Sequence, residues 1–102
     1  MYRITATYHH PDDPQQFLDH YRATHSRLAT QLPGLRNYEW GQCETLDGSR
    51  SPHFLVAIMD WDTKEDAISA LASPEGQAAA ADMGNFAQAG ADVSFHEVVT
   101  PR

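Results

Sequence analysis

The segment from Asp13 to Trp40 constrains the fold most, because it predicts an amphipathic helix that leads directly into an aromatic strand. Asp13 is placed to cap this helix, and Pro14 occupies its first position, where a missing N–H costs nothing. Pro33-Gly34 then ends the helix and turns the chain. Residues at three- and four-residue steps form one apolar stripe, which is typical of a helix packed on a sheet: Phe17, Leu18, Tyr21, Leu28, Ala29 and Leu32.

Two histidines of this helix are expected to face opposite ways. His25 falls in the apolar stripe, one turn after Tyr21, whereas His20 falls on the polar face. Five residues of α-helix correspond to a rotation of about 140°, so the two imidazoles are not expected to share one metal ion. The pattern predicts one inward and one outward histidine.

The whole chain predicts four strands and, after the first helix, a second helical region. Alternating or continuous apolar residues predict strands at 2–9, 35–44, 53–61 and 93–99. A helix is expected from Thr63, with a break at Ser73-Pro74-Glu75 and a second helical segment from Glu75 to about Ala87. The order strand, helix, strand, strand, helix, strand predicts an α+β, ferredoxin-like βαββαβ fold, with helices on one face of a four-stranded antiparallel sheet.

The third predicted strand suggests that the protein is a homodimer. Its run from Phe54 to Met59 is apolar on both faces, and such a strand is covered on both sides. Two helical regions cover only one side of a small sheet. The simplest source of a second cover is another copy of the chain.

Size and charge exclude several classes of function. The 102 residues predict one domain spanning 1–102. The net charge of −7, with seven scattered Lys and Arg residues, argues against nucleic-acid and membrane partners. No segment resembles a signal peptide or a membrane span, and Cys43 is the single cysteine. These features are those of a cytoplasmic protein.

Two motifs resemble those of the EthD family. The first runs from Phe17 to Leu28 (FLDHYRATHSRL) and continues as Leu32-Pro33-Gly34-Leu35. The second contains Ser73-Pro74-Glu75-Gly76-Gln77, followed by Asp82-x-x-Asn85-Phe86. The motifs occur in the family's order, and the resemblance covers essentially the whole chain.

This resemblance implies a dimeric α+β barrel, in which two ferredoxin-like sheets pack face to face, with a pocket between sheet and helices in each subunit. It does not imply one reaction. The family's name-giving members accompany a cytochrome P450 system that degrades ethyl tert-butyl ether, and fungal relatives act on aromatic polyketides as dehydratases or decarboxylases. Other dimeric α+β barrels are cofactor-free monooxygenases, lactone isomerases or haem enzymes.

Three residues are candidates for chemistry. His25 titrates in a range that allows it to act as general acid or base, and it matches the family's histidine; the alternative is a core histidine bonded to backbone. Tyr21 could donate its phenol proton to a developing oxyanion, or simply place its hydroxyl at the edge of the core. Asp82 could orient His25, cap the helix break or lie in solvent.

An aromatic, mostly apolar ligand pocket is the second expectation, and its candidate residues are Phe17, Tyr38, Trp40, Trp61 and Phe86. Each of them could instead belong to the core or to a dimer contact. No zinc-like spacing, phosphate loop or haem-binding pattern is present, so neither a metal nor another cofactor is expected.

The sequence therefore predicts a homodimer that binds a small apolar or aromatic metabolite and performs cofactor-free acid/base chemistry, of lyase, isomerase or monooxygenase type. The alternative is a non-catalytic accessory subunit that binds a metabolite for a partner oxidase such as a cytochrome P450 system. A third possibility is a dimer whose pocket is filled by side chains. The sequence does not decide whether the protein is an enzyme.

Overall fold

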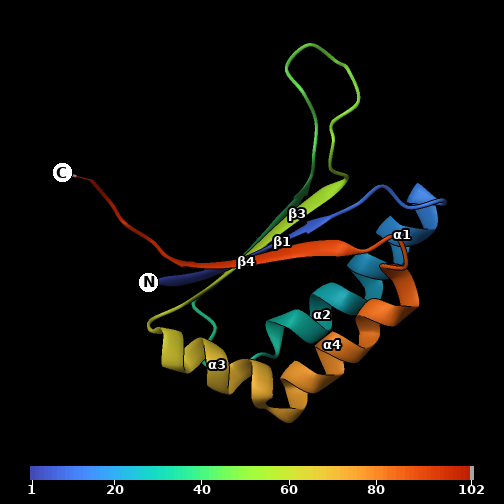
Figure 1. The fold of residues 1–102 in the computed structure, drawn as a ribbon. Helices are drawn as coiled ribbons and strands as arrows, with labels where there is room; N and C mark the ends of the chain where they lie inside the picture. Colours follow the sequence, from blue (N-terminus) through green and yellow to red (C-terminus); the bar gives the residue numbers. More distant parts are fainter. Residues whose placement is uncertain (102) are drawn as a thin grey trace.

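A computed structural model describes residues 1–101 of the chain. Its helices lie together on one face of a four-stranded sheet (Figure 1). In chain order the elements are β1 (Tyr2–Tyr8), α1 (Pro14–His20), the π-helical turn η1 (Tyr21–His25), α2 (Ser26–Thr30), β2 (Asn37–Gln42), β3 (Leu55–Trp61), α3 (Lys64–Ala72), α4 (Pro74–Phe86) and β4 (Ala91–Glu97). No helix among these residues is long and apolar enough to cross a bilayer.

The sheet has the order β2-β3-β1-β4, and all neighbouring strands are antiparallel. This confirms the predicted α+β, ferredoxin-like fold. The strand bounds differ by a few residues from those predicted. In particular, β2 begins at Asn37, since the turn at Pro33-Gly34 extends as far as Leu35, whose N–H donates to the carbonyl of Leu32 at 3.4 Å.

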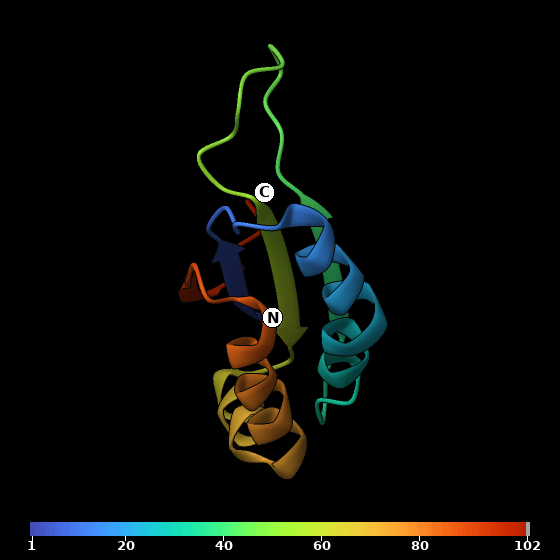
Figure 2. The same ribbon diagram turned by 90° about the vertical axis from the view of Figure 1, so that its right-hand side faces the viewer.

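Strand alternation places the core between the sheet and the helices. Buried residues on the helix-facing side of β1 and β3 are Ile4, Ala6, Tyr8, Leu55, Ala57 and Trp61. They divide into two apolar clusters. The first, mainly aromatic, joins Tyr8 and Leu55 to side chains of the first helical region and α4; the second surrounds Trp61 and reaches α3. Figure 2 shows the first helical region and α4 side by side over the sheet.

The first helical region is not the continuous α-helix that its apolar stripe predicted. Asp13 caps it as expected, through a side-chain bond from the N–H of Gln16, but the turn Tyr21–His25 is π-helical. The N–H of Ser26 donates to the carbonyl of Tyr21, five residues earlier. A π turn contains one residue more than an α turn, so it brings side chains five positions apart onto the same side of the helix.

The second helical region breaks where predicted. Ser73 has an extended backbone and caps α4 by accepting the N–H of Gly76 at 3.1 Å. Gly76 is buried against the end of α3, and a Cβ added there would lie 2.6 Å from the carbonyl carbon of Leu71. Glycine at this position therefore lets α3 and α4 approach each other closely.

Candidate functional site

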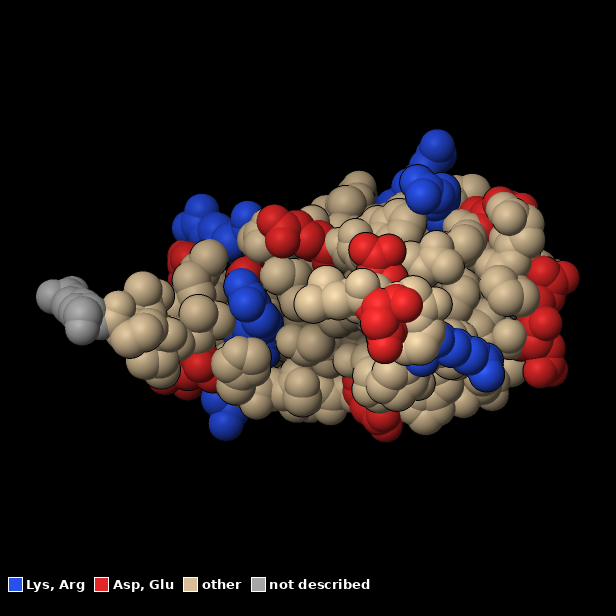
Figure 3. Space-filling model, turned by 90° about the horizontal axis from the view of Figure 1, so that it is seen from above, with Lys and Arg blue, Asp and Glu red and all other residues tan. Residues whose placement is uncertain are grey.

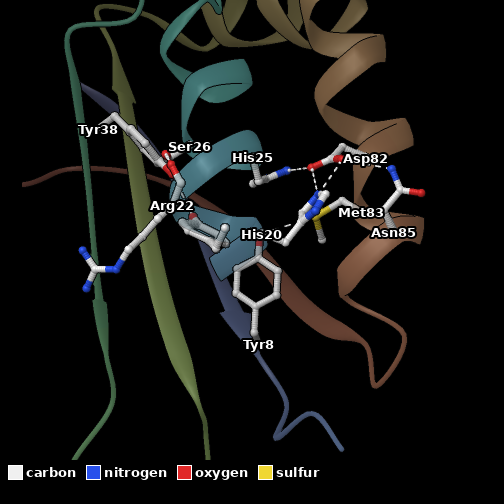
Figure 4. A network of polar contacts seen from close by, with 10 residues as sticks. Tyr8, His20, Arg22, His25, Ser26, Tyr38, Asp82, Met83 and Asn85 are labelled. Carbon is white, nitrogen blue, oxygen red and sulfur yellow. Dashed lines mark hydrogen bonds and ion pairs between the residues drawn. The ribbon is translucent and has the colours of Figure 1, made fainter. Parts of the chain in front are cut away.

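A buried carboxylate on α4, that of Asp82, accepts hydrogen bonds from three side chains (Figure 4). His25 Nδ1 lies 2.9 Å from its Oδ2, and His20 Nε2 lies 2.9 Å from Oδ1 and 3.1 Å from Oδ2. Asn85, one turn later on α4, donates its Nδ2 to Oδ1 at 3.0 Å. Only 5% of Asp82 is exposed. The carboxylate thus links the first helical region to α4.

The expectation that His20 points into solvent is wrong. Its side chain is 28% exposed, and its ring reaches the same carboxylate as His25. The π turn is the physical reason, because it returns the fifth residue to the side from which the first projects. The rotation of about 140° assumed for an α-helix does not hold between these two positions. The two imidazoles therefore share one partner.

The protonation state of His25 follows from its surroundings. Burial lowers the pKa of His25 below its ordinary value of 6.5, although the hydrogen bond to Asp82 acts in the opposite direction. His25 is accordingly a neutral imidazole at neutral pH, and it donates Nδ1–H because an ionised carboxylate only accepts. Its other nitrogen, Nε2, carries the lone pair.

Asp82 stays ionised despite its burial. Burial alone would raise the pKa of this carboxyl, but hydrogen bonds from Asn85, His20 and His25 together hold it below the usual value. Within residues 1–101 no buried side-chain nitrogen or oxygen lacks a hydrogen-bond partner. His25 Nε2 bonds to none of these residues, and 7% of His25 is exposed.

Aromatic rings also pack against His25. The ring centre of Phe86 is 4.6 Å from that of His25, and the ring centre of Tyr21 is 5.2 Å away. Tyr38 donates its hydroxyl to that of Tyr21 at 2.8 Å, and Trp40 packs on Tyr21 at 4.9 Å. Burial raises the pKa of Tyr21 far above its ordinary value, so its phenol remains protonated.

The structure does not bring every predicted ligand residue to this place. Phe17, Tyr38, Trp40 and Phe86 lie in or against the aromatic cluster that contains Tyr21. Trp61 belongs to the other cluster, is fully buried and donates its indole N–H to the carbonyl of Pro33 at 2.9 Å. Its position at the opposite end of β3 separates it from the histidines.

An open cleft of about 440 Å³ lies next to the histidine pair, between α1 and the end of α4. The predicted pocket was mostly apolar, whereas this cleft has many polar residues in its lining, including Asp12, Asp13, Gln16, His20, Asn85 and Gln88. Phe17 and Phe86 form part of its wall. His20, rather than His25, is the histidine that borders the cleft.

Two residues of the site, His20 and Asn85, were not predicted from the sequence. Asn85 follows Asp82 by three residues on α4, and this spacing puts an amide and a carboxylate on one helix face. This three-residue spacing was visible in the sequence. No sequence pattern indicated that His20 contacts Asp82, because that contact depends on the π turn.

Within residues 1–101, no group of three or more His, Cys, Asp or Glu side chains is arranged to hold a metal ion. The histidine pair and Asp82 form a hydrogen-bonded group of titratable side chains.

Comparisons with known proteins agree with this architecture. The model of the EthD domain matches residues 9–90. An uncharacterised 11.0 kDa protein from the thcB–thcC intergenic region of Rhodococcus erythropolis is 42% identical over 103 residues, which cover 99% of this chain and 100% of that protein.

Two solved structures share the fold. An EthD family protein from Bacillus halodurans superposes with a TM-score of 0.90 at 30% identity, covering 97% of this chain and 99% of that one. A dimeric ferredoxin-like protein of unknown function from Thermobifida fusca has a TM-score of 0.66 at 19% identity, covering 95% and 90%. Because the domain model spans most of the chain and two relatives align along nearly all of it, this chain belongs to the EthD family.

Proposed function

We propose that this EthD-domain protein binds a small organic metabolite and transfers protons to and from it without a cofactor, with His25 as the acid/base group. The observation that carries the proposal is the 2.9 Å bond between His25 Nδ1 and the buried carboxylate of Asp82. This bond fixes the ring and its tautomer, and it leaves Nε2 free to take a proton.

In the proposed step, His25 Nε2 removes a proton from the metabolite and becomes an imidazolium. Asp82, which stays ionised, stabilises that charge across the Nδ1–H bond. The proton returns from Nε2 to the product, so the protein ends each cycle unchanged. Tyr21, whose phenol is protonated, is the neighbouring group able to donate to an oxygen on which charge develops.

His25→Asn tests this role while preserving the contact with Asp82. The asparagine Nδ2 can replace His25 Nδ1 as donor to Asp82, but it supplies nothing at the position of Nε2. We expect the melting temperature to change little and the rate of proton transfer to fall by roughly 10²–10⁴-fold. The measurement is NMR-detected deuterium exchange from D2O into the C–H groups beside the carbonyl of small aryl ketones such as acetophenone.

Equal exchange rates for the wild type and His25→Asn would contradict the proposal. Ketone binding without exchange in the wild type would also contradict it, and would favour the alternative of a non-catalytic accessory subunit for a partner oxidase.

We also propose that the protein is a homodimer, formed through the sheet face opposite the helices. Val56 and Ile58 of β3 alternate with the buried Ala57 and therefore project from that face, where each is only half-buried. The T. fusca neighbour is a dimer with the same fold.

One pair of charges on this face, Arg3 and Asp60, is suited to being covered. Arg3 binds both oxygens of Asp60, at 2.8 and 3.0 Å, and Asn37 donates to the same carboxylate at 3.2 Å. Only 3% of Asp60 is exposed. At Asp60, a partner that covers this face therefore meets a satisfied ion pair.

Sedimentation at micromolar concentration is expected to give about twice the chain mass of 11.4 kDa. Ile58→Lys should shift the protein to monomer, since it places a charge at the centre of the proposed contact. Ile68→Lys, on the exposed side of α3, is the matched control and should leave the dimer intact. A monomeric wild type would refute the assembly.

A further inference from the structure

We propose that the cleft between α1 and the end of α4 binds a small neutral molecule that carries a ring and a hydroxyl group, and that His20 accepts the hydrogen bond of that hydroxyl. The proposal goes beyond the acid/base role of His25, because it concerns a different histidine and a binding step. It does not require His25 to be catalytic.

The shape of the cleft fits such a ligand. Its volume of about 440 Å³ lies in the range of pockets that hold small organic molecules. α1 and α4 supply half of its lining, and the loops next to them supply the rest, at residues 11–13 and 88–89. The bond between His20 and Asp82 joins the two helices beside the cleft and holds one of its lining side chains in place before a ligand enters, which lowers the cost of binding.

His20 is a preorganised acceptor in this cleft. In the tautomer that donates Nε2–H to Asp82, the lone pair of His20 lies at Nδ1, and Nδ1 bonds to none of residues 1–101. The ring lies nearly parallel to that of Phe86, at 26° and 5.3 Å between centres. With one edge held by Asp82 and one face by Phe86, the imidazole has a single orientation to offer a ligand.

The charges at the cleft disfavour an anionic ligand. No Lys or Arg occurs among the residues that line the cleft, and the carboxylates of Asp12 and Asp13 lie at its border. Acidic side chains also gather at the end of the molecule where α1 begins, at the right of Figure 3. An anion would be repelled here, whereas a hydroxyl finds an acceptor in His20 and its ring finds apolar wall at Phe17 and Phe86.

Phenol is the probe, and benzoate is the anionic control with the same ring. Binding is followed by calorimetric titration and by the ¹⁵N chemical shift of His20 Nδ1. We expect saturable binding of phenol, a shift of that nitrogen and no detectable binding of benzoate.

Two pairs of variants localise the binding. In His20→Gln the amide nitrogen can still donate to Asp82, but the Nδ1 acceptor is lost, so phenol should bind about tenfold more weakly. His9→Gln is the matched control, because His9 Nε2 bonds to Asp92 in the same way, at 3.0 Å, outside the cleft. Ala89→Phe fills the cleft and should abolish binding, whereas Ala80→Phe, on the exposed side of α4, should not.

The proposal is overturned if phenol does not saturate, if benzoate binds equally well, or if His20→Gln and Ala89→Phe bind phenol as the wild type does. These outcomes are separate from failure of the acid/base role, which is read from deuterium exchange in His25→Asn. Either can fail while the other holds.

Discussion

Asp82→Ala is expected to lower the free energy of unfolding by about 3 kcal/mol, since it leaves His20, His25 and Asn85 without their common acceptor. For a domain of this size, the melting temperature should fall by roughly 15 °C. Thermal and urea unfolding followed by circular dichroism measure both quantities.

Asp92→Ala is the matched control for this substitution. Asp92 also binds a histidine, His9, at 3.0 Å, but both side chains are largely exposed, so little stability should be lost. If the two variants are equally stable, Asp82 does not hold the helices together and the account of the site is wrong.

The pH dependence of stability has the same origin. The pKa values of His25 and Asp82 are both lowered in the folded protein, so the unfolded chain binds more protons than the folded one in acid. The stability that these two groups contribute is present at neutral pH and is lost on acidification. The contribution of His25 is lost as the pH falls below 6.5, and that of Asp82 as the pH falls below 3.8. The Asp82→Ala variant should therefore lose less stability below pH 3.8 than the wild type does.

Gly76→Ala is expected to destabilise the protein by about 2–3 kcal/mol, although alanine favours helices more than glycine does. The added methyl group would overlap the backbone carbonyls of Ala70 and Leu71 at the end of α3, and backbone cannot rotate away as a side chain can. The two helices would have to separate. Chemical denaturation measures the loss.

Gly84→Ala separates this clash from helix propensity. Gly84 lies on the same helix, α4, but a Cβ there would meet nothing within 4 Å. This variant should gain up to about 1 kcal/mol. A loss of stability in Gly84→Ala, or none in Gly76→Ala, would contradict the packing argument.

The elements of the fold could be predicted because each depends on local chemistry. Asp13 and Ser73 cap their helices by side-chain bonds to nearby backbone N–H groups, and strand alternation selects which side chains face the helices. The π turn could not be predicted in this way. An apolar stripe of α-helical spacing runs through it, and the extra residue is visible only from the hydrogen bond between Ser26 and Tyr21.

The site was predicted in part for the same reason. Helical spacing placed His25 inside. The structure brings Asp82 within hydrogen-bond distance of it, which corresponds to the alternative that Asp82 orients His25. A catalytic role for His25, Tyr21 and Asp82 stays a prediction, and so does a cytoplasmic location. His20 could not be placed because its direction depends on the π turn, and Trp61 was misplaced because periodicity shows a face and not a position along the sheet.

The tautomer of His25 should be measured first, from two-bond ¹H–¹⁵N correlations of the histidine rings at pH 7. We expect a neutral His25 with its proton on Nδ1 and its lone pair on Nε2, and a titration midpoint below 6.5. A ring protonated on Nε2 alone, or charged at pH 7, would contradict both the bond to Asp82 and the proposed role of His25.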